Sequence, residues 1–223
     1  DMIVWTKNAD GSWSYDYTVF DRWVELMTGL GIDRSINCYS MLPWNNELHY
    51  RDGSTGRFVD VTADPGTPAF EALWEPFLTD FTGHLREKGW LGRTNIAMDE
   101  RSPEEMTDAL DLLRKTAPEL GITMADNKNS YLNYPFINSM CVKVRDRVPP
   151  QHIAERRAQG FITTYYVCCS DRFPNMFTFS APAEAVYAGW YMAACGYDGF
   201  LRWAYNSWVG EPLTDSRFRT FPA

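Results

Sequence analysis

Hydrophobic and polar positions along the chain follow two alternating spacings. Short apolar runs of strand length are mostly followed by longer stretches in which apolar residues recur every three or four positions, as on one face of a helix. The helical stretches are 16–30, 67–89, 102–121, 150–159 and 181–196. The strand-like runs are 2–5, 32–41, 94–100, 121–127, 136–144, 161–169 and 199–208. The pattern therefore predicts about seven strands separated mostly by helices.

Regular alternation of strands and helices favours a parallel sheet. This many units favours a closed barrel over an open doubly wound sheet, and no glycine-rich phosphate-binding motif follows any strand. We predict an α/β fold, a (β/α)8 TIM barrel that lacks its first strand and its C-terminal end. Residues 1–223 are expected to form a single catalytic-type domain. Because the chain opens on Asp1 without an initiator methionine, we expect it to be part of a longer protein.

A long polar segment, 42–68, separates the second strand from the second helix. Loops of this length in compact domains are more often functional than idle. The Asp52-Gly53 pair in its middle suits the tight turn of a β-hairpin. We therefore expect a small hairpin here, with Trp44 in the part of the segment that follows the strand.

Composition excludes several classes of function. The formal net charge is −8 and no cluster of lysine and arginine interrupts it, so we expect no nucleic-acid partner and no membrane insertion. Five dispersed cysteines predict small buried side chains rather than a disulfide framework, and three dispersed histidines support neither a zinc site nor a Cys–His nucleophile. No metal and no cofactor are expected. Aromatic residues make up 15% of the chain, which suits either core packing or stacking against sugar rings.

The strand pattern also predicts which side chains face the lumen of a barrel. Helix-facing positions are the more apolar ones, which puts Ile96 and Met98 outside, and Leu201 outside in the last strand. The polar groups predicted to face inward near the rim are Tyr39, Asp99, Asn127, Lys143, Tyr166, Arg202 and Asn206. A packed plug has no use for so many hydrogen-bonding groups, because each one buried requires a partner. Trp44 and Trp208, in loops at the same end, would form walls for a bound sugar or cap the apolar interior.

Two adjacent carboxylates, Asp99 and Glu100, end the buried run 94–98. Just after them, Ser102 and Glu105 form the sequence signature of a capping box that starts the next helix. One interpretation is purely structural, with the pair as a salt-bridged strand terminus and helix cap. The other is catalytic, with Arg101 as a partner of Asp99 or of a substrate oxygen.

Conventional glycosidases place two carboxyl groups on opposite sides of the scissile bond, about 5 Å apart for retention and about 6.5–9.5 Å for inversion. Side chains of neighbouring residues diverge from a strand and cannot easily straddle a bond. They suit a substrate whose own 2-acetamido oxygen attacks the anomeric carbon, while one carboxylate holds the amide N–H and the other protonates the leaving oxygen. Asp126 and Asp171 are other rim carboxylates that would serve a conventional pair.

Three segments, "INCYSMLPW", "NIAMDERSPEEM" and "GFLRWAYNSW", resemble the catalytic region of glycoside hydrolase family 123 and a related domain of unknown function. The resemblance implies a bacterial TIM-barrel N-acetyl-β-galactosaminidase that works by substrate-assisted retention. On this resemblance Asp99 matches the residue that orients the acetamido group, and Glu100 matches the general acid/base. It also implies periplasmic or extracellular localisation.

The resemblance implies a substrate class, the terminal N-acetylhexosamine of a glycan or glycolipid. Members of the family normally carry a preceding β-sandwich region and the opening strand of the barrel, neither of which we recognise in this sequence, so we expect the isolated chain to be folded yet inactive. Two alternatives stay open at this point. One is a catalytically silent carbohydrate-binding or scaffold barrel, and the other is a conventional two-carboxylate glycosidase.

Overall fold

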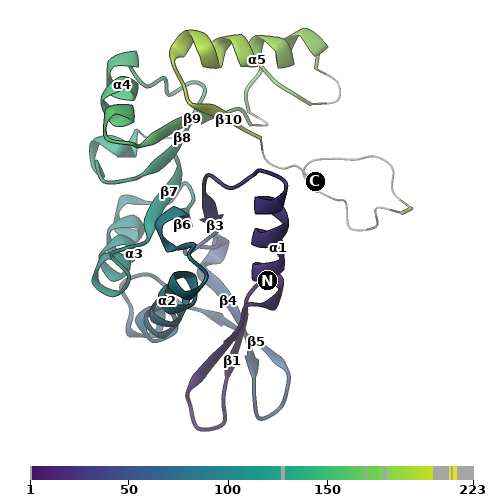
Figure 1. The fold of residues 1–223 in the computed structure, drawn as a ribbon, viewed down its shortest axis with the longest axis vertical. Helices are drawn as coiled ribbons and strands as arrows, with labels where there is room; N and C mark the ends of the chain where they lie inside the picture. Colours follow the sequence, from purple (N-terminus) through teal and green to yellow (C-terminus); the bar gives the residue numbers. More distant parts are fainter. Residues whose placement is uncertain are drawn as a thin grey trace. The chain divides into compact units, whose positions relative to one another are not determined.

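The structure is a computed structural model that describes residues 2–126, 129–168, 170–177, 180–202, 211 and 213–214. The chain divides into two compact units. The first comprises Asp1–Met124 and Phe136–Asn138, and the second comprises Ala125–Pro135 and Ser139–Ala223. Each unit combines helices with parallel strands (Figure 1).

The first unit contains a mixed sheet with the strand order β2-β1-β4-β5, in which β1 and β4 are parallel and the two outer pairs are antiparallel. Its strands are β1 (Val4–Lys7), β2 (Trp13–Asp16), β4 (Glu47–Asp52) and β5 (Phe58–Thr62). The strands β4 and β5 form the hairpin predicted within 42–68. Its turn is fixed by Asp52, whose Oδ1 accepts hydrogen bonds from the backbone N–H of Ser54 at 2.8 Å and of Thr55 at 2.9 Å. An aspartate that bonds its own following backbone in this way is a common turn former.

Three neighbouring parallel strands carry the candidate site, two of them wholly in the first unit and the third in it up to Met124. They are β3 (Ile36–Cys38), β6 (Thr94–Met98) and β7 (Gly121–Asp126), with β6 between the other two. All five residues of β6 are buried, as expected for a strand covered on both faces. The helices of this unit are α1 (Thr18–Gly29), α2 (Pro68–Glu87) and α3 (Pro103–Thr116), with short 3-10 helices η1 (Trp44–Asn46) and η2 (Leu91–Arg93).

An aromatic cluster forms much of the core of this unit. The ring of Trp5 stacks on Phe77 with centroids 4.4 Å apart, and Phe77 stacks on Phe81 at 5.2 Å. Phe20 of α1 meets Phe81 edge to face at 5.4 Å. These contacts join α1, α2 and the mixed sheet. For these rings, the packing interpretation of the aromatic content is therefore the correct one.

The second unit repeats the strand–helix alternation. Its parallel strands are β8 (Ser139–Lys143), β9 (Ile162–Tyr166) and β10 (Gly199–Leu201), and its helices are α4 (Pro150–Ala158), α5 (Pro182–Cys195) and the 3-10 helix η3 (Ser130–Leu132). Two residues of β9 face these helices. Tyr165 donates its Oη–H to the carbonyl of Ala188 in α5 at 2.6 Å, and Arg156 of α4 donates Nε–H to Thr163 Oγ1 at 3.0 Å.

The predicted α/β class is confirmed, and the parallel strands with their helices are consistent with part of a TIM-like barrel. A closed (β/α)8 barrel is not confirmed, since the residues that the structure describes form six parallel strands. The strand β2 was not predicted. It arises because the run 13–16 turns back on β1 and pairs antiparallel with it. The assignment of residues 1–223 to a single domain stays a prediction.

Candidate active site

The two carboxylates lie in the short turn between β6 and α3. The strand ends at Met98, and α3 begins after Ser102, whose Oγ accepts a hydrogen bond from the N–H of Glu105 at 3.2 Å. The Glu105 carboxylate accepts the N–H of Ser102 at 3.2 Å in return, so the predicted capping box is present. With both elements fixed, Asp99 and Glu100 have little freedom to move away from the strand end.

Tyr39 holds one of the two carboxylates. It follows β3 directly, and its Oη–H donates to Asp99 Oδ2 at 2.6 Å. Partial burial, together with the hydrogen bond to the Asp99 carboxylate, raises the pKa of Tyr39 well above its usual range. The phenol therefore stays protonated and donates to Asp99 throughout the neutral range.

The same face of these two strands carries a second polar pair. Asn95 donates Nδ2–H to Asn37 Oδ1 at 2.8 Å, and the two residues are partners in the register of β3 and β6. Tyr39 and Asp99 continue this face two and four residues further along their strands. Both contacts are consistent with the prediction that Tyr39 and Asp99 point to the same side, and Asn37 and Asn95 lie on that face with them.

The Arg101 guanidinium does not pair with the Asp99 carboxylate, contrary to one expectation from the sequence, although the backbone N–H of Arg101 donates to the carbonyl of Asp99 at 2.8 Å. Its Nε and Nη2 donate to the carbonyl of Leu42 at 3.1 and 2.9 Å, and Nη2 also donates to the carbonyl of Pro43. The guanidinium lies over the ring of Trp44, 4.7 Å from its centroid, and 3.9 Å from Glu105. Sequence reasoning missed this arrangement, because nothing local in the sequence indicates a contact across about 57 residues.

Trp44 begins η1, and its indole is 61% exposed. The segment before it is fixed to β6, since Met41 donates its N–H to the carbonyl of Ala97 at 3.1 Å. Met41 and Leu42 are themselves fully buried. The first unit thus brings together three predicted site residues, Tyr39, Trp44 and Asp99, around the end of β6.

In the second unit, Lys143 and Tyr166 are the last residues of β8 and β9 and are partners in register. They share the face opposite Tyr165, which contacts α5. This agrees with the predicted inward orientation of both side chains. Lys143 donates to Ser170 Oγ at 2.8 Å, and Tyr166 is buried.

The predicted orientation of β10 is wrong. Phe200 pairs in register with Tyr165 and Leu201 with Tyr166, so Leu201 lies on the face predicted to point inward. The rule failed because both neighbours are apolar, and polarity could not decide which of them faces the helices. Arg202 follows the strand, and its guanidinium lies over the ring of Phe177 at 5.2 Å. Asn127, Asn206 and Trp208 lie outside the residues that the structure describes.

The other rim carboxylates are deeply buried. Asp126, the last residue of β7, is 1% exposed, and Asp171 is 3% exposed. Asp171 lies 2.9 Å from Arg145 Nε and accepts the N–H of Cys168 at 2.7 Å. This pairing is what a buried structural carboxylate requires, and it speaks against Asp171 as the second carboxylate of a conventional glycosidase.

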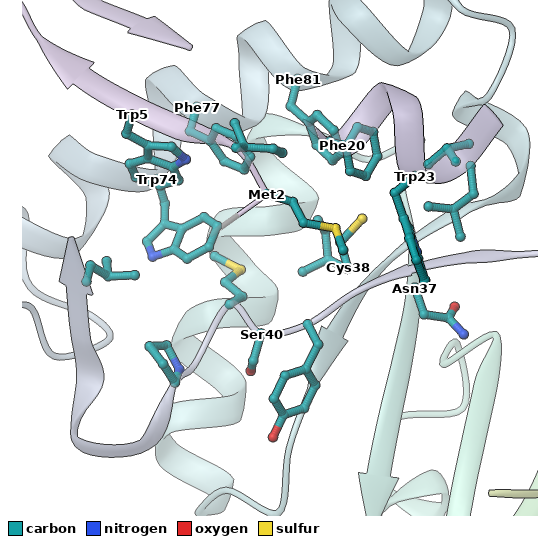
Figure 2. A pocket seen from close by; sticks show the side chains of 18 of the residues that line it. Met2, Trp5, Phe20, Trp23, Asn37, Cys38, Ser40, Trp74, Phe77 and Phe81 are labelled. Atoms are coloured by element: carbon teal, nitrogen blue, oxygen red, sulfur yellow. The ribbon is translucent and has the colours of Figure 1, made fainter. Parts of the chain in front are cut away.

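A cavity of about 710 Å³ lies beside β3 in the first unit (Figure 2). Aromatic side chains form part of its wall, among them Trp5, Phe20, Trp23, Trp74, Phe77 and Phe81. Tyr39 and Ser40 also line it, but within the described chain Asp99 and Glu100 do not. The candidate chemistry therefore belongs to the carboxylate pair at the strand end rather than to this cavity.

One cluster of potential metal ligands lies among the described residues. Glu47, His49 and Asp60 of the β4–β5 hairpin have ligand atoms within 4.8 Å of one another, and all three side chains are exposed. His49 Nδ1 lies 2.6 Å from Asp60 Oδ1, which already accounts for the juxtaposition as an ion pair or hydrogen bond. We assign no metal to this cluster. None of the described helices is long and apolar enough to cross a membrane.

Comparison with known proteins agrees with the geometry. A solved structure of a family 123 glycoside hydrolase from Clostridium perfringens, described in terms of glycolipid glycan hydrolysis, matches with a TM-score of 0.85 and 33% sequence identity. The match covers 96% of this chain and 40% of the other, so the present chain spans less than half the length of that protein. A comparison with curated proteins finds no match. The family model described as "Glycoside hydrolase 123, catalytic domain" matches residues 1–223. The chain therefore belongs to glycoside hydrolase family 123.

Proposed function

We propose that the protein is a retaining exo-glycosidase that removes terminal β-linked N-acetylgalactosamine by substrate-assisted catalysis. The observation that carries the proposal is the adjacent pair at the end of β6, in which Tyr39 fixes Asp99 through a 2.6 Å hydrogen bond. The pair leaves the nucleophile unassigned, since neighbouring carboxylates cannot face each other across a glycosidic bond. A substrate that carries a 2-acetamido group supplies the nucleophile itself.

In the first step Glu100 acts as general acid and transfers its proton to the glycosidic oxygen. The acetamido carbonyl oxygen attacks the anomeric carbon as the bond to the leaving group breaks, which closes an oxazolinium ring. Asp99 Oδ1 accepts the amide N–H and stabilises the positive charge that develops on it. Because Tyr39 occupies Oδ2, the carboxylate is held in one orientation before substrate arrives, and such preorganisation is a major source of catalysis.

In the second step the Glu100 carboxylate takes a proton from water. The oxygen of that water attacks the anomeric carbon, and the bond to the acetamido oxygen breaks. The product regains its acetamido group, Glu100 regains its proton, and two inversions at the same carbon leave the β configuration unchanged. Both proton transfers are thus accounted for by Glu100, and the mechanism needs no carboxylate nucleophile.

The substrate class follows from the acetamido requirement. A terminal N-acetylhexosamine of a glycan or glycolipid presents this group, and the family 123 structure from Clostridium perfringens is described as hydrolysing glycolipid glycans. Lys143 and Tyr166 are proposed to contribute further contacts to the sugar, as are Trp44 and the residues Asn127, Asn206 and Trp208. A periplasmic or extracellular location, where such glycans occur, belongs to the same proposal.

The decisive experiment compares two aryl β-galactosides, one with and one without the 2-acetamido group, in the full-length protein. We expect release of the aryl group only from the acetamido sugar. Glu100→Gln, which keeps the shape but not the acid, should lose turnover while N-acetylgalactosamine still binds. Asp99→Asn should lower kcat by two to three orders of magnitude, about the effect of removing one charge-stabilising group.

Each alternative has its own signature in this experiment. Cleavage of both sugars at similar rates would exclude acetamido participation and return the search to a conventional pair of carboxylates. A folded protein that cleaves neither sugar but binds N-acetylgalactosamine would instead be a carbohydrate-binding barrel.

A further inference from the structure

Arg101, three residues after the end of β6, has a buried side chain that makes several contacts. Its side chain is 9% exposed, and it makes three hydrogen bonds to the carbonyls of Leu42 and Pro43. The ion pair with Glu105 at 3.9 Å is long, and the partner is 30% exposed. The main contacts of the Arg101 guanidinium are therefore with the backbone of the segment 39–44, which ends in Trp44.

That segment contains both a residue beside the carboxylates and the exposed indole. Tyr39, at its start, donates to Asp99, and Trp44, at its end, lies under the Arg101 guanidinium with 4.7 Å between the guanidinium carbon and the ring centroid. Arg101 itself is covalently next to Glu100. Arg101 thus links the two ends of the site, because it is next to Glu100 in the chain and its side chain contacts the Trp44 ring.

We propose that Arg101 is a positioning residue that holds Trp44 as one wall of the sugar subsite, beside Asp99 and Glu100. This inference rests on the proposed function and adds to it the residue that sets the place of the aromatic wall. Trp44 is 61% exposed although the guanidinium covers part of it. Exposed indole surface packs against the C–H face of a pyranose, and a ring fixed in advance loses less conformational entropy when the sugar binds.

A lysine cannot replace this arginine. The contacts need a planar group that lies over an indole and at the same time donates from two nitrogen atoms to the carbonyls of Leu42 and Pro43. An ammonium group at the same position has the charge but neither the stacking surface nor the fork of donors. Arg101→Lys is therefore the informative variant, because it keeps the charge beside Glu100 and removes the geometry.

The chain offers a matched control at the opposite end of the same strand region. Arg93, which precedes β6, donates Nη1–H to the carbonyl of Asp33 at 2.7 Å and Nη2–H to Thr28 Oγ1 at 3.3 Å. It also fixes a loop through a backbone carbonyl, but it lies away from Asp99 and Glu100. Arg93→Lys should therefore weaken a loop contact, as Arg101→Lys does, but should not change sugar binding.

The experiment uses the full-length protein labelled with 5-fluorotryptophan, with the Trp44 ¹⁹F resonance assigned by its absence in Trp44→Phe. Arg101→Lys should shift this resonance and raise KM for the aryl N-acetylgalactosaminide about tenfold, with kcat within about twofold. Arg93→Lys should do neither. Trp44→Leu should raise KM by a similar factor, and adding Arg101→Lys to it should cost no more, as for two residues that act as one unit.

An unchanged Trp44 resonance in Arg101→Lys would overturn the proposal, and so would a shifted resonance with an unchanged KM. If Arg101→Lys does not fold, Trp44→Leu decides alone, because an unchanged KM there removes the indole from the subsite. A wild-type protein that cleaves no acetamido sugar, but whose Trp44 resonance still depends on Arg101, would overturn the proposed function and retain the positioning role.

Discussion

Two tyrosines donate a hydrogen bond to a carboxylate, and removing each hydroxyl tests whether that bond contributes to catalysis. Tyr39 and Tyr17 both make such a bond, to Asp99 at 2.6 Å and to Asp80 at 2.7 Å. Hydrogen bonds to charged groups contribute about 1.5–3 kcal/mol. The two bonds are chemically alike, but only the first lies beside Glu100. Removing each hydroxyl in turn separates a catalytic contribution from a structural one.

We expect Tyr39→Phe to lower kcat on the aryl N-acetylgalactosaminide by about 10–100-fold, since 1.4 kcal/mol corresponds to a factor of ten. The cause is loss of the orientation of Asp99, so KM should change less than kcat. Steady-state kinetics of the purified variant measure both quantities.

Tyr17→Phe is the control and should leave kcat and KM as in the wild type, while urea unfolding shows a loss of stability. Equal kinetics for Tyr39→Phe and the wild type would mean that the Tyr39–Asp99 bond is a structural contact only. In that case Asp99 would lose its main support as the residue that orients the acetamido group.

At the level of single residues, the sequence predicted the two carboxylates but not the contacts of Arg101 beside them. Asp99 and Glu100 were predictable because polar residues that end a buried run are conspicuous, and a family resemblance named them. The contact between Arg101 and Trp44 was not predictable. An arginine side chain is long enough to reach several partners, and the three-dimensional fold determines which of them it contacts. The expected pairing of Arg101 with Asp99 was reasonable from charge alone and is wrong.

Among the helices and strands, α3 is the helix whose N-terminus adjoins the candidate site. Its cap residue, Ser102, comes two residues after Glu100, and the capping box fixes the place of the turn. We expect Ser102→Ala to lower the free energy of unfolding by about 1 kcal/mol, the usual cost of losing a cap. It should also lower kcat several-fold, because the first turn of α3 frays and the turn that carries both carboxylates becomes less fixed.

Another N-cap supplies the comparison. Thr67 caps α2 and accepts the N–H of Phe70 at 3.3 Å, at a helix start that carries no candidate catalytic group. Thr67→Ala should lower the free energy of unfolding, measured by urea unfolding, without changing kcat. The kinetics are measured at a temperature well below the thermal unfolding midpoints of both variants. If the two variants lose stability and activity in the same proportion, the start of α3 has no special role in catalysis.

The elements also show where a polarity rule works. The face assignment of β3 and β6 agrees with the structure because each strand has an asparagine among apolar residues, and Asn37 and Asn95 bond to each other. It failed in β10, where Phe200 and Leu201 are both apolar and the strand is three residues long. The helices fared better than the strand β2, because a helical stripe repeats over several turns, whereas a four-residue strand offers only two positions per face.

On the scale of the molecule, the two units raise the question of whether they unfold together. One cysteine in each unit, the partly buried Cys38 and the buried Cys141, allows a direct test. Burial raises the pKa of Cys38 in the first unit and of Cys141 in the second to about 12. Because the thiolate is the reactive form, the folded protein at about pH 8 should react with an alkylating reagent roughly a thousandfold more slowly at these positions than an unperturbed thiol. Unfolding restores the ordinary pKa and exposes the sulfur.

We therefore predict that alkylation of Cys38 and Cys141, followed by mass spectrometry of each peptide across a urea series, gives one common midpoint. A single domain unfolds as one cooperative unit, so both thiols should become reactive in the same transition, coincident with the loss of circular dichroism. Two separate midpoints would instead show that the units are distinct cooperative regions, and the prediction of one domain over 1–223 would be wrong. The order of those midpoints would then say whether the unit that carries Asp99 and Glu100 retains its structure after the other has unfolded.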